Sequence, residues 1–411
     1  MNASIPDPYT IPLEQIDPSD ARLFQQQKHW AYFERLRKED PVHFVNSAQF
    51  GPYWSITRFN DIVYVDSHHE YFSSIPTIVI GDSSVDFEPP MFIAMDPPKH
   101  DVQRAVASPA VTPAQLQQWE GLIRERIQAV LDSLPLGEAF NWVDKVSIEL
   151  TAMMLATLFD IPQEDRRKLI YWSEVATTSP NVGNSGATEE ERKEKLQECL
   201  AYFTEVWNRR VNEPPKMDFI SLLAHHPETR DMDPMEYLGN LILLIVGGND
   251  TTRNTMTGSV YALHENPEQF AKLKADRSLI PSMVSETIRW QTPLAHMRRN
   301  ATCDVELGGK IIRKGDKVVM WYVSGNRDED IIEDPDEYII DRPQSRHHVS
   351  FGFGIHRCMG NRLAEMQLRI LWEELLARFD RIEVVAEPER VESNFVMGYR
   401  NLKVVLHPLS G

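Results

Sequence analysis

One helical pattern, residues 234–265, limits the fold more than any other feature of the sequence. Asp233 suits the cap of its first turn, Pro234 suits the first helical position, and Pro267 follows its end. At about 1.5 Å per residue this helix is roughly 48 Å long, which is enough to cross a whole domain. The sequence therefore predicts a large domain with this helix running through it.

Helical spacing also dominates the rest of the chain after residue 100. Further helices are predicted over 113–134, 141–160, 162–176, 188–212, 267–275, 279–291 and 361–378. Before them, residues 31–45 read as a short helix leading to PVHFV, and 52–59 as a small strand pair. Strand-like pieces occur at 304–323 and 382–407. We expect a mainly α fold with small β-sheets, in one domain over residues 1–411 whose β-rich part spans about 31–75.

Composition excludes several classes of protein. The 43 basic and 61 acidic residues give a net charge of −18, which repels nucleic acid and anionic membranes. The three cysteines, Cys199, Cys303 and Cys358, are too few and too scattered for a disulfide framework. The start of the chain is polar and proline-rich, unlike a signal peptide, and the apolar run 241–246 is too short to span a bilayer. We expect a cytoplasmic protein with no membrane span and no nucleic-acid partner.

Two irregular segments interrupt the helical pattern. Residues 75–98 mix apolar side chains with Gly and Pro, and residues 177–187 are small and polar. Long irregular segments in compact domains are either binding loops or plain surface loops, and composition alone leaves both open.

The predicted long helix contains an unfavourable stretch, GGNDTT at 247–252. Gly247 and Gly248 each cost about 1 kcal/mol relative to Ala in a helix interior, and Asp250 and Thr251 are poor helix formers. A kink or close packing against a neighbouring helix would explain the glycines. The other explanation is a local opening where a small ligand lies against the backbone, beside an acid and an alcohol.

The stretch FGFGIHRCMG, residues 351–360, presents Cys358 just before an amphipathic helix. The N–H groups at the start of a helix favour a thiolate, which is the form needed for metal ligation or nucleophilic attack. A lone cysteine is otherwise a small buried hydrophobic residue. These residues by themselves leave all three roles open.

Phe351, Gly354, Cys358 and Gly360 match the pattern F-x-x-G-x-x-x-C-x-G, and here the sequence resembles the cytochromes P450, the haem-thiolate monooxygenases. The resemblance implies a single triangular-prism-like domain with haem b between the long central helix and the helix after the cysteine loop. It also implies that Cys358 is the axial ligand of the haem iron.

Two further motifs fit the same family. Gly247 to Thr251 match its (A/G)-G-x-(D/E)-T, which places Gly248 at the haem and implies that Thr251 hydrogen-bonds dioxygen while Asp250 relays protons. Glu286 and Arg289 match its E-x-x-R, a spacing that occurs four more times in the chain. Only this pair lies between the long helix and the cysteine loop, so we interpret it as structural, together with Arg342. The family positions that bind the two haem propionates are held by His100, Arg104, Arg299 and His356, with Arg298 as the alternative to Arg299.

The resemblance implies a monooxygenase that inserts one atom of O₂ into a C–H bond. Neither a flavin nor an NAD motif is visible, so electrons are expected from NAD(P)H through a ferredoxin reductase and a [2Fe–2S] ferredoxin. Ferredoxins are acidic, so we expect them to dock on a basic patch on the cysteine-loop side. Its candidate residues are Lys99, Arg104, Arg346, Arg357 and Arg362.

The segments expected over the haem are apolar, which fits an aliphatic substrate. The predicted pocket residues are Ile80, Phe87, Met91, Leu244, Gly247, Leu294, Met297, Phe395 and Val396. The stretches VGGNDTTRNTMTG and MWYVSGNRDE resemble the sequences of the bacterial terminal hydroxylases of medium-chain alkanes and fatty acids. A terpene or steroid hydroxylase is the alternative within the family. A haem-binding sensor and a cysteine hydrolase are alternatives outside it, and Asp250 with Thr251 count against the sensor.

Overall fold

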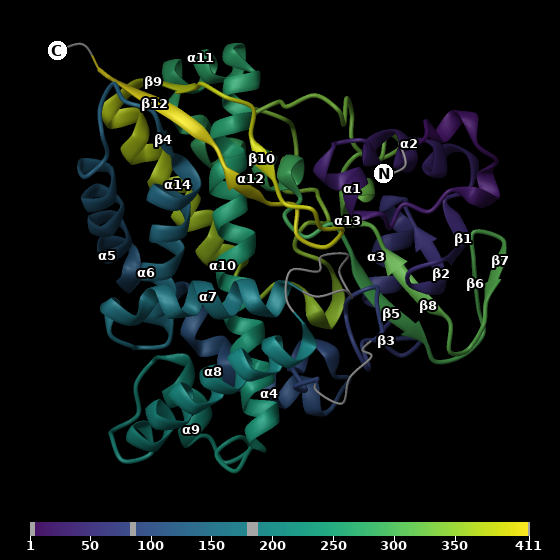
Figure 1. Cartoon of the computed structure of the whole chain (residues 1–411), viewed down its shortest axis with the longest axis horizontal. Helices are drawn as coiled ribbons and strands as arrows, with labels where there is room; N and C mark the ends of the chain where they lie inside the picture. The colour runs from purple at the N-terminus through teal and green to yellow at the C-terminus, as the bar shows by residue number, and fades with distance from the viewer. Residues whose placement is uncertain (1–4, 83–87, 179–187, 410–411) are drawn as a thin grey trace.

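The computed structural model of the chain describes residues 5–82, 88–178 and 188–409. Figure 1 shows a helix-rich part that holds the C-terminus and a β-rich part that holds the N-terminus, lying side by side. The segment 99–107 and the cysteine loop lie where these two parts meet.

The long helix α10, Pro234–Glu265, crosses the helix-rich part (Figure 1). Asp233 caps it, since its carboxylate accepts a 2.8 Å hydrogen bond from the Met235 N–H, and Pro234 occupies the first turn. Three helices pack against α10, namely α6 (Glu149–Leu158), α7 (Arg166–Thr177) and α12 (Ile280–Gln291), as does the π-helical turn Val143–Ile148. The helix is continuous through residues 247–252, so the two glycines do not break it.

The remaining helices surround α10 or connect the two parts. In the helix-rich part they are α5 (Pro113–Asp132), α6 (Glu149–Leu158), α7 (Arg166–Thr177), α8 (Glu189–Arg210), α9 (Phe219–His225), α11 (Pro267–Ala275), α12 (Ile280–Gln291) and α14 (Asn361–Arg378). Elsewhere they are α1 (Ala21–Gln25), α2 (His29–Glu39), α3 (Phe59–Ser67), α4 (Lys99–Ala107) and α13 (Tyr322–Gly325).

The largest sheet has the strand order β1-β2-β8-β5-β3. Its strands are β1 (Val42–Ser47), β2 (Gly51–Ile56), β8 (Lys317–Met320), β5 (Met297–Ala301) and β3 (Phe72–Ser73). β2 and β8 are parallel, with Trp54 opposite Val318, and the other pairs are antiparallel. The sheet brings residues from both ends of the chain together, because β5 and β8 come more than 200 residues after β2.

Three small sheets complete the β structure in the described residues. They are β4 (Phe140–Asn141) with β12 (Lys403–Pro408) and β9 (Phe379–Val384), β6 (Val305–Leu307) with β7 (Lys310–Ile312), and β10 (Glu389–Arg390) with β11 (Tyr399–Asn401).

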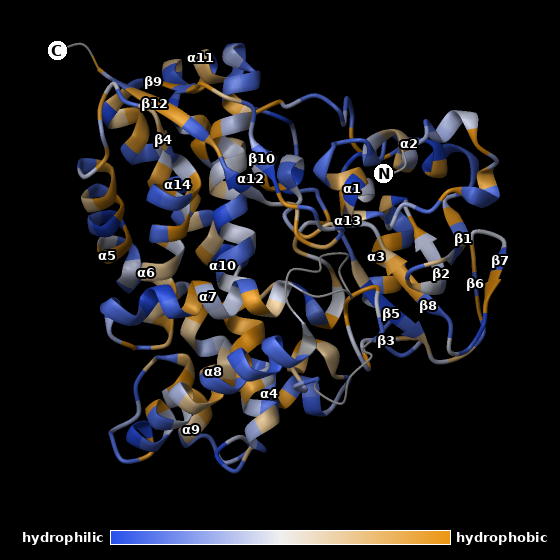
Figure 2. Cartoon of the chain, in the orientation of Figure 1, coloured by the Kyte–Doolittle hydropathy of each residue, from blue (hydrophilic) through white to orange (hydrophobic). Residues whose placement is uncertain are grey.

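Buried apolar side chains form three clusters. One fills the helix-rich part, and two lie on and beside the main sheet. Figure 2 shows that the outer helices, such as α5, carry both hydrophobic and hydrophilic residues, as expected for helices with one face on the core. None of the helices within the described ranges is long and apolar enough to cross a membrane.

The predicted fold class, mainly α with small sheets, is confirmed, and most predicted helices lie within a few residues of those observed. Five helices of the described residues were not predicted: α1, α3, α4, α9 and α13. They are only four to nine residues long, so each gives few repeats of the helical period. The short helix predicted before PVHFV is α2, which ends at Glu39, and Pro41 separates it from β1.

Candidate active site

The cysteine loop, residues 351–360, is a tight turn that packs against α3. Gly352 and Gly354 both have φ of +64°, a conformation that other residues rarely adopt, and a Cβ on Gly354 would lie 2.3 Å from the Asp66 carbonyl oxygen. The buried Asp66 carboxylate also accepts a 2.7 Å hydrogen bond from the Phe353 N–H. Within the loop the Cys358 N–H donates to the Phe351 carbonyl over 2.8 Å. Glycine is therefore required at 354 by close approach to α3.

Cys358 is accessible in this loop, although enough protein surrounds its thiol to change its acidity. Burial raises the pKa of Cys358, and the Gly360 N–H and the nearby Arg104 and Arg357 lower it without cancelling that effect. The helix start thus acts in the expected direction but does not by itself favour a thiolate. A bound metal cation would supply the missing positive charge, because a coordinating thiol loses its proton.

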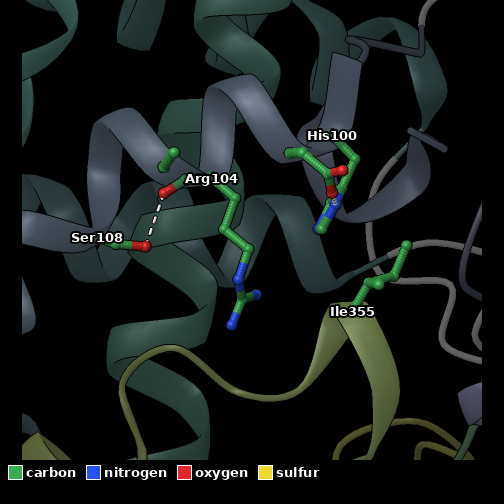
Figure 3. Close-up of a pocket in the computed structure, with 6 residues that line it drawn as sticks. His100, Arg104, Ser108 and Ile355 are labelled. Atoms are coloured by element: carbon green, nitrogen blue, oxygen red, sulfur yellow. Dashed lines mark hydrogen bonds and ion pairs between the residues drawn. The ribbon is translucent and has the colours of Figure 1, made fainter. Parts of the chain in front are cut away.

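Cationic side chains gather beside this loop. His100 and Arg104 project from α4 towards the loop that carries Ile355 (Figure 3), and the rings of His100 and His356 lie 4.3 Å apart. His100, Arg104 and Ile355 line a cavity of about 340 Å³. Burial, then Arg299, His100 and Arg104, lower the pKa of His356 to about 2. Residues from three segments that are far apart in sequence therefore converge: α4, β5 and the cysteine loop.

The donors of this cluster fit a dianionic ligand. The His100 Nε2 and both ring nitrogens of His356 are buried and have no hydrogen-bond partner among the described residues. Within the same ranges, no three His, Cys, Asp or Glu side chains come together as metal ligands. A single cysteine ligand beside unsatisfied histidine nitrogens and nearby arginines suits a haem, whose porphyrin supplies the other iron ligands and whose propionates need hydrogen-bond donors and positive charge.

The side chains of Arg298 and Arg299, the two alternatives for a propionate partner, point in different directions. The Arg298 guanidinium turns to residues 75–82, which we call the first loop, and pairs with Asp82 at 2.6 Å. Arg299 lies near His356 and forms a buried 2.7 Å ion pair with Asp66. Asp66 was missed from the sequence, since only its place in an otherwise apolar part of α3 distinguishes it. His69, which also lowers the pKa of His356, has no recognisable sequence signal.

The two glycines of α10 have different surroundings. A Cβ on Gly247 would meet nothing within 4 Å, whereas one on Gly248 would lie 2.8 Å from a methyl group of Leu155 on α6. Gly248 thus allows α10 to pack closely against α6, and Gly247 borders open space. Thr251, one turn on, donates a 2.8 Å hydrogen bond to the Gly247 carbonyl.

Asp250 lies on a different face of α10 from Thr251. Its carboxylate is 1% exposed, pairs with Arg253 at 2.5 Å and accepts a 2.6 Å hydrogen bond from the Ser173 hydroxyl on α7. Arg253 also contacts Glu174, which is largely exposed, at 3.4 Å. The acid and the alcohol of GGNDTT are therefore neighbours in sequence whose side chains have different partners.

Glu286, Arg289 and Arg342 form one buried cluster. Arg289 makes two hydrogen bonds to Glu286, at 2.7 and 2.8 Å, and Arg342 lies 3.2 Å from the same carboxylate. Both arginines also donate to backbone carbonyls of residues 326–337. In two of the other E-x-x-R pairs the arginine has a different partner: Arg37 pairs with Glu329, and Arg167 with Glu149.

Four of the nine expected pocket residues lie in two segments that meet. Leu294 and Val396 form an isolated antiparallel bridge, and Met297, Phe395 and Val396 belong to one apolar cluster against which Leu294 and Phe353 of the cysteine loop pack. Ile80 is fully buried in a separate cluster, and its neighbours Ile78 and Val79 contact Met297's cluster instead. Leu244 is buried on α10 and Met91 is half-buried. Phe87 lies outside the described residues.

Comparison with known proteins defines the class. The family model of cytochrome P450 matches residues 56–406. Together with the cysteine loop and the fold, this shows that the chain belongs to the cytochrome P450 family, and it is a haem- and dioxygen-dependent monooxygenase.

Individual relatives cover nearly the whole chain. Linalool 8-monooxygenase of Pseudomonas putida is 35% identical over 96% of this chain and all of that protein. The methyl-branched lipid omega-hydroxylase of Mycobacterium tuberculosis is 31% identical over 90% of both proteins. Among solved structures, CYP153D17 from Sphingomonas sp. PAMC 26605 is 48% identical with a TM-score of 0.90, over 95% of this chain and 98% of that one.

Proposed function

We propose that this monooxygenase hydroxylates the terminal carbon of medium-chain n-alkanes or fatty acids, with electrons from a [2Fe–2S] ferredoxin. The reaction consumes the substrate, O₂, two electrons and two protons and gives the alcohol and water. The apolar cluster of Ile78, Met297, Phe395 and Val396, packed against the cysteine loop through Phe353, is the observation that supports an aliphatic substrate. The omega-hydroxylase relative agrees with attack at a chain end.

The roles of the site residues follow from their positions. Cys358 would ligate the haem iron, while Phe351, Gly354 and Gly360 shape the loop that holds it. The side chains of His100, Arg104, Arg299 and His356 would bind the propionates, the two arginines as cations and the two histidines through ring N–H groups. Haem, when bound, supplies the iron at which dioxygen is activated.

Protons would be handled by α10. Thr251 can turn its hydroxyl from the Gly247 carbonyl to a ligand in the open space beside it, because a hydroxyl both donates and accepts. Asp250 would relay protons, while Arg253, which stays charged, holds its carboxylate and extends to the largely exposed Glu174. Glu286, Arg289 and Arg342 would hold the backbone of residues 326–337 in place and touch no substrate.

The basic docking patch would be narrower than its five candidates suggest. Lys99 pairs with Glu236, Arg346 lies 3.4 Å from Glu365, and Arg104 is turned inward to the Arg357 carbonyl. Arg357 and Arg362 are exposed and lie on either side of Cys358 in sequence. These two arginines would provide most of the attraction for an acidic ferredoxin.

The deciding experiment supplies the enzyme with octane, dodecanoic acid or linalool, together with NADH, a ferredoxin reductase and a ferredoxin. We expect 1-octanol and 12-hydroxydodecanoic acid as the main products. Mainly internal alcohols would contradict the terminal assignment. Faster, tightly coupled oxidation of linalool would favour the terpene alternative, which the linalool 8-monooxygenase relative supports.

A further inference from the structure

His296 connects three segments that are far apart in sequence. It lies between the pocket residues Leu294 and Met297 and is fully buried. Its Nε2 lies 3.1 Å from the Ile80 N–H in the first loop, and its Nδ1 lies 2.8 Å from the Asn394 carbonyl, just before Phe395. Segments 78–82, 293–298 and 393–397 therefore meet at one imidazole.

The two hydrogen bonds fix the tautomer of the His296 imidazole. A backbone N–H can only donate, so Nε2 must accept from Ile80, and Nδ1 must carry the proton that it donates to the Asn394 carbonyl. Burial lowers the pKa of His296 to about 4, so the ring is neutral at pH 7. Only neutral histidine offers a donor and an acceptor on opposite sides of one flat ring.

Aromatic neighbours hold the ring in its plane. Trp321 and Phe395 both pack on His296 in edge-to-face arrangements, with ring centroids 5.0 and 5.3 Å away. The ring is thus confined on its faces by packing and at its edge by hydrogen bonds.

Other contacts join these segments in pairs, but not all three. The Ala295 N–H donates to the Phe395 carbonyl, and the Met397 N–H donates to the Pro293 carbonyl. The Arg298 N–H donates to the Ile78 carbonyl. The His296 side chain, by contrast, forms hydrogen bonds to residues 78–82 and to segment 393–397 at once.

We propose that His296 is a positioning residue for substrate selectivity: its neutral imidazole holds the first loop and segment 393–397 at a fixed separation, and so sets which carbon of the substrate is presented. This rests on the proposed function, since the selectivity it sets is that for the chain end. Displacing either segment moves Ile78, Phe395 and Val396 relative to Met297, and these are the residues of the apolar cluster beside the cysteine loop.

Three substitutions test the hydrogen bond to Ile80 and the hydrogen bond to Asn394 independently. His296→Phe keeps an aromatic ring and removes both hydrogen bonds. His296→Asn places an amide near the position of Nδ1, so it keeps the Asn394 contact, and His296→Gln reaches the position of Nε2, so it keeps the Ile80 contact. The control is His43→Phe, because His43 in β1 is also buried and also has both ring nitrogens bonded, to Asp40 at 2.8 Å and the Ile16 carbonyl at 3.1 Å.

Amide hydrogen exchange tests the positioning directly. In His296→Phe we expect exchange at residues 78–82 and 393–397 to accelerate at least about tenfold. His296→Asn should accelerate only the first segment and His296→Gln only the second, while His43→Phe should change neither. Unchanged exchange at both segments in His296→Phe would overturn the proposal.

Product analysis tests selectivity. With octane, His296→Phe should lower the ratio of 1-octanol to internal octanols at least about threefold and raise KM more than it lowers kcat. The carbon monoxide spectrum should stay that of wild type. A product ratio equal to that of His43→Phe would also overturn the proposal. Hydrogen exchange and the change in haem spectrum on substrate binding need no terminal product, so they remain decisive if terminal hydroxylation itself fails.

Discussion

The Ser173 hydroxyl on α7 donates a 2.6 Å hydrogen bond to the Asp250 carboxylate in the middle of α10. Arg253 holds the other carboxylate oxygen at 2.5 Å and extends to Glu174 at the surface. A buried acid is therefore connected to solvent through a neighbouring helix, although nothing in its sequence context indicates which helix.

Loss of this acid should slow turnover. We expect Asp250→Asn to lower kcat about 10²-fold, because a positioned proton donor typically contributes that much, and to increase the solvent isotope effect. Ser173→Ala should lower kcat only severalfold, since Arg253 still holds the carboxylate. Thr177→Ala, which removes a hydroxyl bonded to the Ser173 carbonyl on the same helix, is the control and should turn over normally. Wild-type rates in Asp250→Asn would exclude Asp250 from proton transfer.

Loss of the Thr251 hydroxyl should separate oxygen use from product formation. In Thr251→Ala we expect NAD(P)H oxidation to continue while most of the product yield is lost as peroxide or water, because the hydroxyl beside Gly247 is missing. Product formed per NAD(P)H oxidised is the measurement. Thr257→Ala, at a buried threonine bonded to Ser147, is the comparison and should remain coupled.

Haem ligation should depend on one of the three cysteines. Cys358→Ala should lose the strongly red-shifted Soret band of the reduced carbon monoxide complex. Cys303→Ala, at another accessible cysteine, should keep it. A red-shifted band in Cys358→Ala would show that another residue is the axial ligand.

Glu286 should contribute stability that depends on pH. Burial alone would raise the pKa of Glu286, but Arg289, the Ile339 N–H and Arg342 together lower it below its ordinary 4.5. A carboxyl whose folded-state pKa is lowered stabilises fully above its unfolded pKa and loses that contribution as pH falls through the folded value. Wild type should therefore lose unfolding free energy below about pH 4.5.

Replacement of this carboxylate should be costly at neutral pH. Glu286→Gln leaves two buried arginines without their anion and should lower the unfolding free energy by about 3–5 kcal/mol at pH 7. Glu34→Gln has the same E-x-x-R spacing, but Glu34 pairs with Lys38 at the surface and its loss should matter little. Denaturant titrations from pH 4 to 7 measure both, and equal losses in the two variants would contradict the structural role of Glu286.

Electron delivery should depend on exposed arginines beside Cys358. Arg357→Glu with Arg362→Glu should raise the KM for ferredoxin about tenfold at low salt and flatten its salt dependence, because like charges then face each other. Lys272→Glu with Lys274→Glu on α11, which lies far from α4 in Figure 1, is the charge-matched control. Unchanged salt dependence in the double arginine variant would place ferredoxin elsewhere.

The long helix and its unfavourable stretch, residues 247–252, could be predicted because they depend on local signals. Asp233, Pro234 and Pro267 mark the ends of α10, and caps and prolines act on the backbone next to them. The roles of Gly247 and Gly248 could not be separated in this way. Which of two adjacent glycines packs against Leu155 and which borders open space depends on the placement of α6 beside α10.

The sequence by itself determined the family and the mainly helical fold and predicted Cys358 as the haem ligand, because these follow from motifs and periodicities within short stretches. Only the tertiary structure decided which side chains act together. Asp66 supports the cysteine loop, Ser173 holds Asp250, and His296 joins Ile80 to Asn394, and each pair is separated by about 80 to 290 residues. Such contacts arise when helices and strands pack, so no local pattern in the chain encodes them.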